Sequence, residues 1–138
     1  MNPKNVRAEF TRAQKALQAA KLLHADGLFE DAVSRAYYAV MHAAKAALLA
    51  HDQIAESHTA LRRYFGSVLV QTGRIEKEWA SVLAREQDRR IAADYNANFL
   101  MDAEGSLQLV EDANHFVERI RNYLLEQKIL ETEDKEAR

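Results

Sequence analysis

The sequence of 138 residues contains no cysteine, one proline and only four glycines. Without cysteine the chain has no disulfide bonds, thiolate metal ligands or thiol nucleophiles, and such a composition suits a reducing cytoplasm. So few prolines and glycines leave too few turn residues for a strand-rich fold. The formal net charge is only -2. The chain therefore lacks the excess of lysine and arginine that non-specific coating of nucleic acid requires.

Long hydrophobic runs are lacking as well. The most apolar stretch, residues 36–50, is interrupted by His42 and Lys45 and is too short to cross a bilayer. No segment resembles a signal peptide. We therefore expect a cytoplasmic protein that does not enter a membrane.

Residues that favour helices dominate the sequence, and its apolar residues recur at helical spacing. Gly27 and Gly73 are typical helix stops, and Ser57 and Asp102 are typical N-caps. We predict an all-α fold in one domain, residues 1–130, followed by a charged tail, residues 131–138, that frays. The expected architecture is an antiparallel up-and-down bundle of four long helices plus a shorter one. The predicted helices cover residues 3–25, 28–51, 57–72 and 75–92, with a last long helix from Asp102 onward.

The second helix has an unusual polar pair. One face is uniformly apolar, but the opposite face carries Arg35, Tyr38 and His42 among small residues such as Ala39 and Ala46. Arg35 and His42 are seven residues apart, so they share a face and lie roughly 10 Å apart along the axis. Because this helix is apolar on nearly every side, we predict that the second face meets another copy of the chain in a homodimer.

The pair of Arg35 and His42 suits RNA cleavage by the RNA's own 2'-hydroxyl. The histidine would transfer a proton, and the arginine would stabilise charge on the phosphate. Without cysteine or a two-histidine helical motif, we expect no metal site and no cofactor. A purely structural alternative pairs Arg35 with Asp31 one turn away and places His42 in a hydrogen bond at an interface.

Four further residues are supporting candidates. Tyr38 shares the face of Arg35 and His42, where its hydroxyl would contact a substrate or cross the interface. His58 would either assist at the cleft or lie at the surface as a capping residue. Arg90 and Asp94, one turn apart, would form an ion pair that pins the fourth helix to the following loop or would stand beside the Arg35 and His42 site.

Several segments resemble the HEPN domain, in particular its small stand-alone bacterial and archaeal members. The strongest stretch is residues 32–44, AVSRAYYAVMHAA. The other similar segments are His58 with Thr59, residues 64–66, residues 72–75, and Arg90 with residues 93–95. Together they cover most of the chain and are more specific than any one of them.

The resemblance implies a dimeric helical bundle and a metal-independent ribonuclease. In this family an arginine precedes a histidine by a short spacing, which implies His42 in proton transfer and Arg35 at the phosphate. It also implies RNA as substrate and a small nucleotidyltransferase antitoxin as partner of a toxin. Ala36 departs from active members, which often carry a polar residue there. The alternative is therefore a non-catalytic module that binds a nucleotide or a nucleotidyltransferase, or a purely structural helical dimer.

Overall fold

The computed structural model describes residues 1–131, and within that range the chain is helical with no strand. The elements are α1 (Pro3–Ala25), α2 (Phe29–Leu49), α3 (His58–Tyr64), the π-helical turn η1 (Phe65–Val70), α4 (Lys77–Tyr95) and α5 (Ala103–Glu126). The predicted all-α class is confirmed. The predicted tail, apart from residue 131, lies outside the described residues.

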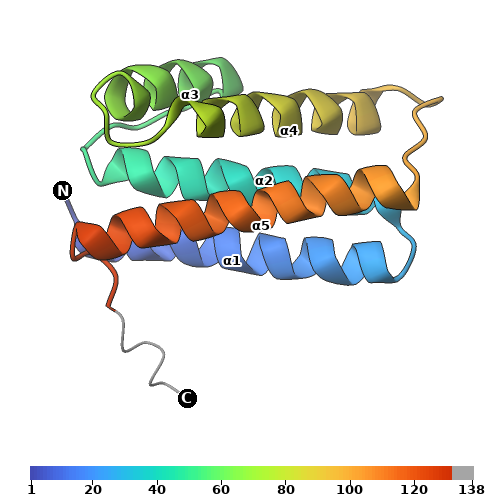
Figure 1. Cartoon of the computed structure of the whole chain (residues 1–138), viewed down its shortest axis with the longest axis horizontal. Coiled ribbons are helices and arrows are strands. Elements are labelled where there is room, and N and C mark those ends of the chain that lie inside the picture. Colours follow the sequence, from blue (N-terminus) through green and yellow to red (C-terminus); the bar gives the residue numbers. More distant parts are fainter. Residues whose placement is uncertain (132–138) are drawn as a thin grey trace.

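The four long helices run alternately in opposite directions, which is the predicted up-and-down bundle (Figure 1). In this view α2 lies between α4 and α1, and α5 passes in front of it. All three of these helices pack against α2. The short α3 and η1 pack at the end of the bundle where α4 begins. The second helix is thus the centre of the molecule.

Side-chain caps and left-handed glycines set most helix boundaries. Asn2, Ser57 and Asp102 each accept a hydrogen bond from a backbone N–H in the first turn of α1, α3 and α5. Gly27 and Gly73 adopt φ values of 80° and 79°, which a side chain would disfavour. The predicted stops at these glycines are confirmed, because the chain reverses there.

Two boundaries differ from the sequence-based expectation. The predicted third helix is not uniform: its second half is a wider π-turn, which brings both Phe65 and Leu69 into the core. The fourth helix continues to Tyr95, three residues beyond the expected end at Ala92. An ion pair between Arg90 and Asp94 spans this extra turn and favours the helical conformation.

The small residues of α2 do not need a second subunit to cover them. Ala39 and Ala46 are 0% exposed within the single chain. The assumption that the whole second face of α2 is left uncovered for another copy of the chain is therefore wrong, since α1, α4 and α5 already enclose α2 on most sides. Only a narrow part of the helix stays accessible, and any dimer contact through α2 must use it.

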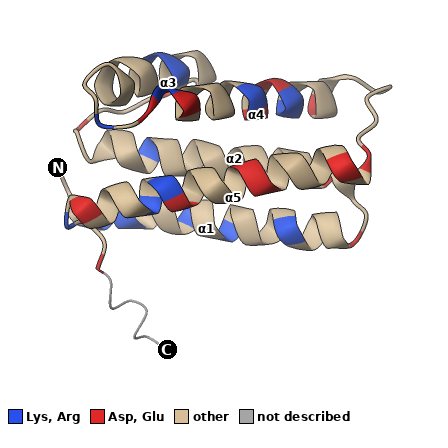
Figure 2. Cartoon of the chain, in the orientation of Figure 1, with Lys and Arg blue, Asp and Glu red and all other residues tan. Residues whose placement is uncertain are grey.

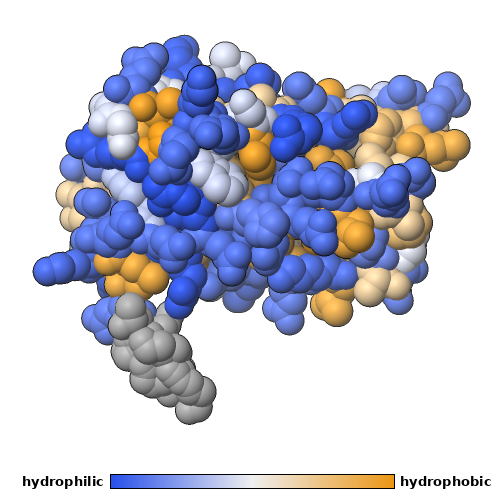
Figure 3. All heavy atoms as spheres, in the orientation of Figure 1, coloured by the Kyte–Doolittle hydropathy of each residue, from blue (hydrophilic) through white to orange (hydrophobic). Residues whose placement is uncertain are grey.

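Charged residues lie mainly on the outer helices, whereas the central α2 carries few of them (Figure 2). The face formed by α4 and α5 is largely hydrophilic, with scattered apolar patches (Figure 3). Among the described residues no helix is long and apolar enough to cross a membrane.

Candidate functional site

A strip of α2 stays open to solvent between the flanking helices. It carries Arg35, Tyr38, His42 and Lys45, and we call these four residues the α2 strip. Spacings of three and four residues place them on one side of the helix. Arg35 is exposed and the other three are half-buried. The structure therefore brings the predicted Arg35, Tyr38 and His42 together on one accessible surface.

His42 is held by a carboxylate from α1. Its Nδ1 makes a short hydrogen bond to Oε2 of Glu9. This contact, more than any other, keeps the pKa of Glu9 below its usual value, although partial burial opposes the shift. An ionised carboxylate can only accept, so Nδ1 of His42 carries the proton. Nε2 of the neutral imidazole is then left with a lone pair that can accept a proton.

Arg35 lies over the ring of Tyr38. Its guanidinium carbon is 5.5 Å from the ring centroid, a cation–π contact at an exposed position. The structure places no ion pair between Arg35 and Asp31, so this part of the structural alternative is wrong. The guanidinium donors point to no described carboxylate and can receive an anion.

Arg90 of α4 extends the site from the other side. Its Nη2 donates to the Tyr38 hydroxyl at 2.9 Å. Its Nε lies 2.7 Å from Oδ2 of Asp94, which confirms the predicted ion pair, although the N–H is not aligned for a hydrogen bond. Asp94 in turn accepts from the Ser34 hydroxyl at 2.8 Å. The ion pair thus exists, although Asp94 belongs to the last turn of α4 and not to a following loop. Arg90 also lies beside the α2 strip.

His58 lies at the start of α3 and faces the same region. Burial raises the pKa of Tyr37 to about 12, and its hydroxyl shares a hydrogen bond of 2.5 Å with Nδ1 of His58. Burial and the nearby cations Arg90 and Lys45 lower the pKa of His58, which favours its neutral form. His58 does not cap α3, because the Ser57 hydroxyl does so.

A cavity of about 370 Å³ adjoins the strip at this point. It lies between α2 and α3 and shares Tyr38 and Lys45 with the α2 strip, and His58 forms part of its wall. We call it the α2–α3 cavity. The predicted residues thus surround one continuous surface made of the strip and this cavity.

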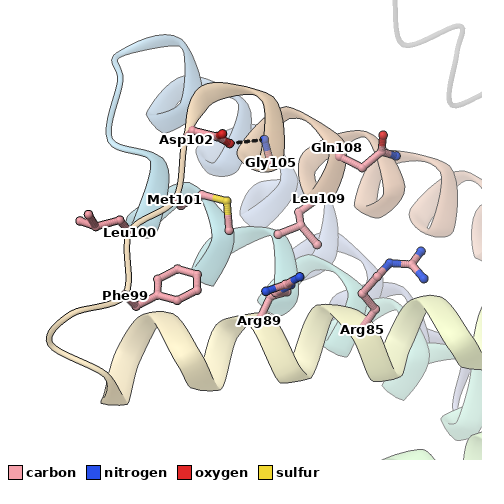
Figure 4. Close-up of a pocket in the computed structure, with 9 residues that line it drawn as sticks. All are labelled: Arg85, Arg89, Phe99, Leu100, Met101, Asp102, Gly105, Gln108 and Leu109. Carbon is pink, nitrogen blue, oxygen red and sulfur yellow. Dashed lines mark hydrogen bonds between the residues drawn. The ribbon is translucent and has the colours of Figure 1, made fainter.

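A larger cavity, about 620 Å³, lies elsewhere, between α4, the following loop and the start of α5 (Figure 4). Arg85 and Arg89 face it from α4, opposite Phe99 and Met101. Arg85 is paired with Asp112 on α5. No histidine lines this cavity, so it offers no group for proton transfer near neutral pH, and we do not assign the chemistry to it.

Two residues of the site were not identified from the sequence. Lys45 follows His42 by three residues, so helical spacing alone places it on the strip. Glu9 is different, because nothing in the sequence reveals which turn of α1 faces His42. Its contact depends on how the two helices are rotated against each other.

The fold and the strip define the class: an all-helical bundle with an arginine and a histidine on the open side of its second helix. The sequence profile of the HEPN domain matches residues 6–128. The chain therefore belongs to the HEPN domain family.

Several relatives are similar over most of their length. A protein of Methanocaldococcus jannaschii named "Putative toxin MJ0605" is 35% identical over 83% of this chain and 84% of its own. A second protein of that organism, "Putative toxin MJ0142", is 26% identical over 89% of this chain and 84% of its own. A UPF0332 protein of Gloeobacter violaceus is 33% identical over 82% of this chain and 90% of its own.

Proposed function

We propose that this chain is a metal-independent endoribonuclease of the HEPN type that cleaves single-stranded RNA. The observation that carries the proposal is the α2 strip, where an accessible Arg35 and a His42 oriented by Glu9 share one open surface. The free imidazole nitrogen suits proton transfer, and the guanidinium, which pairs with no described carboxylate, suits phosphate stabilisation.

The reaction begins when Nε2 of His42 accepts the proton of a ribose 2'-hydroxyl. The 2'-oxygen attacks the adjacent phosphorus, the bond to the 5'-oxygen breaks, and that oxygen takes its proton from solvent water. Arg35 binds the phosphate oxygens while charge develops on them. The products are a 2',3'-cyclic phosphate and a 5'-hydroxyl end.

The arginine and the histidine of one site are proposed to come from two copies of the chain. The midpoint between Arg35 and His42 falls at Tyr38 and Ala39, and a two-fold axis there would set two α2 helices antiparallel. Arg35 would then lie opposite His42 of the partner subunit. Each phosphate would meet an arginine from one chain and a histidine from the other, so a monomer would hold only half of a site.

We further propose that the enzyme acts in the cytoplasm as the toxin of a two-gene module, with a nucleotidyltransferase as antitoxin. The names of the two Methanocaldococcus jannaschii relatives support the toxin role. A small nucleotidyltransferase gene next to the gene of this chain would support the proposed antitoxin partner.

A second candidate function is a non-catalytic module that binds a nucleotide or a nucleotidyltransferase. It is favoured by Ala36, which stands where active family members often carry a polar residue. Ala36 is also fully buried here and contributes no group to the strip.

Incubation of the purified protein with single-stranded RNA in EDTA tests the first proposal. We expect 2',3'-cyclic phosphate ends, with activity lost in His42→Ala and in Arg35→Ala. A positioned proton-transfer group contributes about 10²–10⁴-fold, so the loss is easy to measure. His115→Ala, at an exposed position on α5, is the matched control. An inactive wild type, or variants as active as wild type, would overturn the proposal.

A further inference from the structure

The α2–α3 cavity is placed to receive a part of the RNA next to the cleaved phosphate. Lys45 lines it and follows His42 by only three residues, about 4.5 Å along the helix axis. Tyr38 belongs to both the α2 strip and the cavity wall. A nucleotide whose phosphate lies at His42 therefore has its neighbouring base at the mouth of the cavity.

The cavity walls suit a flat aromatic group. Met41, Leu61 and the ring of Tyr38 supply apolar surface, and the volume of about 370 Å³ lies at the small end of ligand pockets. Bases stack on aromatic side chains in single-stranded nucleic-acid sites. Since Tyr38 is held by its hydrogen bond from Arg90, its ring is fixed in place.

The polar lining is more selective than the apolar one. Glu56 brings a carboxylate, which only accepts hydrogen bonds, and Lys45 brings an ammonium, which only donates. Guanine is the base that presents two adjacent N–H donors, at N1 and N2, beside an acceptor at O6. A carboxylate accepts both donors at once, and a lysine commonly donates to O6 or N7 of guanine.

We propose that the α2–α3 cavity binds one guanine base adjacent to the scissile phosphate, with Glu56 accepting from its N1 and N2 and Lys45 donating to its O6. This inference rests on the proposed ribonuclease function. Lys45 lines the cavity, and Arg90 is close enough to act on His58 in its wall, so two cations stand near the polyanionic backbone that carries the base.

The test is cleavage of a single-stranded RNA pool of random sequence, with the cut sites read by sequencing. We expect guanosine enriched at one position next to the cut. Glu56→Gln should reduce kcat/KM at guanosine sites about 5- to 100-fold while sites with other bases change little, because a bidentate contact discriminates by about that factor. Glu78→Gln, at an exposed acid on α4, is the matched control and should keep the preference.

A binding measurement separates the two proposals. The His42→Ala protein, which cannot cleave, is titrated with a fluorescent oligonucleotide containing one guanosine and with a second in which adenosine replaces it. Tighter binding of the guanosine oligonucleotide, lost on adding Glu56→Gln, supports the cavity assignment even if no cleavage is seen. Cleavage by wild type with no base preference, or a preference unchanged in Glu56→Gln, would overturn this inference and leave the ribonuclease intact.

Discussion

Glu9 and His42 form the contact on which the proposed proton transfer depends. Glu9→Gln keeps an oxygen that can accept from Nδ1, but it removes the negative charge that Glu9 places beside the ring. We expect kcat to fall by about 10- to 100-fold, less than the full contribution of a proton-transfer group of about 10²–10⁴-fold. The change is measured as kcat and KM on one RNA substrate, and KM should change little because Glu9 does not contact the phosphate.

Glu78→Gln removes one negative charge from an exposed site on α4 and serves as control for a general charge effect. Circular dichroism should show equal helix content in both variants. A Glu9→Gln protein with wild-type kcat would mean that the carboxylate plays no part in the reaction.

Glu86 is a second carboxylate whose surroundings are unusual. It is 0% exposed on α4, and both carboxylate oxygens lack a hydrogen-bond partner among the described residues. Burial first, and then the nearby Asp112, raise its pKa to about 9. The folded chain thus holds Glu86 protonated at neutral pH, whereas an unfolded chain would release the proton above about 4.5.

This difference gives a prediction for stability against pH. Between about pH 4.5 and pH 9 the folded state binds one more proton at Glu86 than the unfolded state, so its contribution to the free energy of unfolding falls as pH rises. Glu86→Met removes the buried polar group, and we expect it to stabilise the protein by about 1–3 kcal/mol at pH 7.

Urea denaturation of wild type and Glu86→Met at pH 5, 7 and 9 measures the effect. The difference between the two proteins isolates Glu86, because all other titrating groups are shared. The advantage of the variant should grow with pH. An advantage that stays constant, or a less stable variant at pH 9, would contradict a protonated buried Glu86.

Arg90, near the C-terminal end of α4, links this helix to α2. The guanidinium donates a hydrogen bond to the Tyr38 hydroxyl and forms an ion pair with Asp94. It also lies 5.9 Å from the ring centroid of Tyr37. Only 13% of the Arg90 side chain is exposed, so solvent screens these contacts little. We expect Arg90→Ala to lower the free energy of unfolding by about 1–3 kcal/mol.

Hydrogen exchange adds a local readout for the same variant. Amides of residues 88–95 should exchange faster in Arg90→Ala, because the last turns of α4 lose their attachment to α2. Arg89→Ala, at the exposed neighbouring position, is the control and should leave this segment protected. Equal protection in both variants would show that packing alone holds the end of α4.

At the level of elements, the sequence predicts what depends on local rules. Caps such as Ser57 and Asp102 and stops such as Gly27 and Gly73 depend on residues within a turn or two, and the structure confirms them. The π-turn at Phe65–Val70 was not predicted, because such turns are rare and the apolar spacing here fits an ordinary α-helix equally well. The extra turn of α4 depends on contacts of Asp94 with Arg90 and Ser34.

The same limit applies to the candidate site. Arg35, Tyr38 and His42 share one helix, so spacing alone predicts that they lie together. Glu9 comes from another helix, and its contact with His42 is set by the rotation of α1 against α2. The burial of Ala39 and Ala46 within one chain was missed for a similar reason. An apolar helix surface does not reveal whether neighbours in the same chain or another copy cover it.

At the scale of the whole molecule, the proposed site is complete only in a dimer. Sedimentation at micromolar concentration should give twice the chain mass of 15.7 kDa. A monomer at that concentration would contradict the composite site. Because the accessible part of α2 is narrow, we expect charge reversal at Arg35, as in Arg35→Glu, to weaken the dimer, whereas reversal at the exposed Lys77 of α4 should not.

Mixing two inactive variants tests which chains share a site. Arg35→Ala keeps His42, and His42→Ala keeps Arg35, so a mixed dimer holds one intact residue of each kind on opposite chains. If each phosphate meets Arg35 from one subunit and His42 from the other, one of the two sites in a mixed dimer is whole. Random exchange makes half of all dimers mixed, so about a quarter of wild-type activity should return.

The controls make this result specific. Each variant alone must stay inactive at the same total concentration, and a mixture of His42→Ala with the double variant Arg35→Ala/His42→Ala must also stay inactive. If both residues of a site came from one chain, no mixture of the single variants would recover activity, because every chain would carry a defective site. Recovery near a quarter therefore requires that the arginine and the histidine act across the interface.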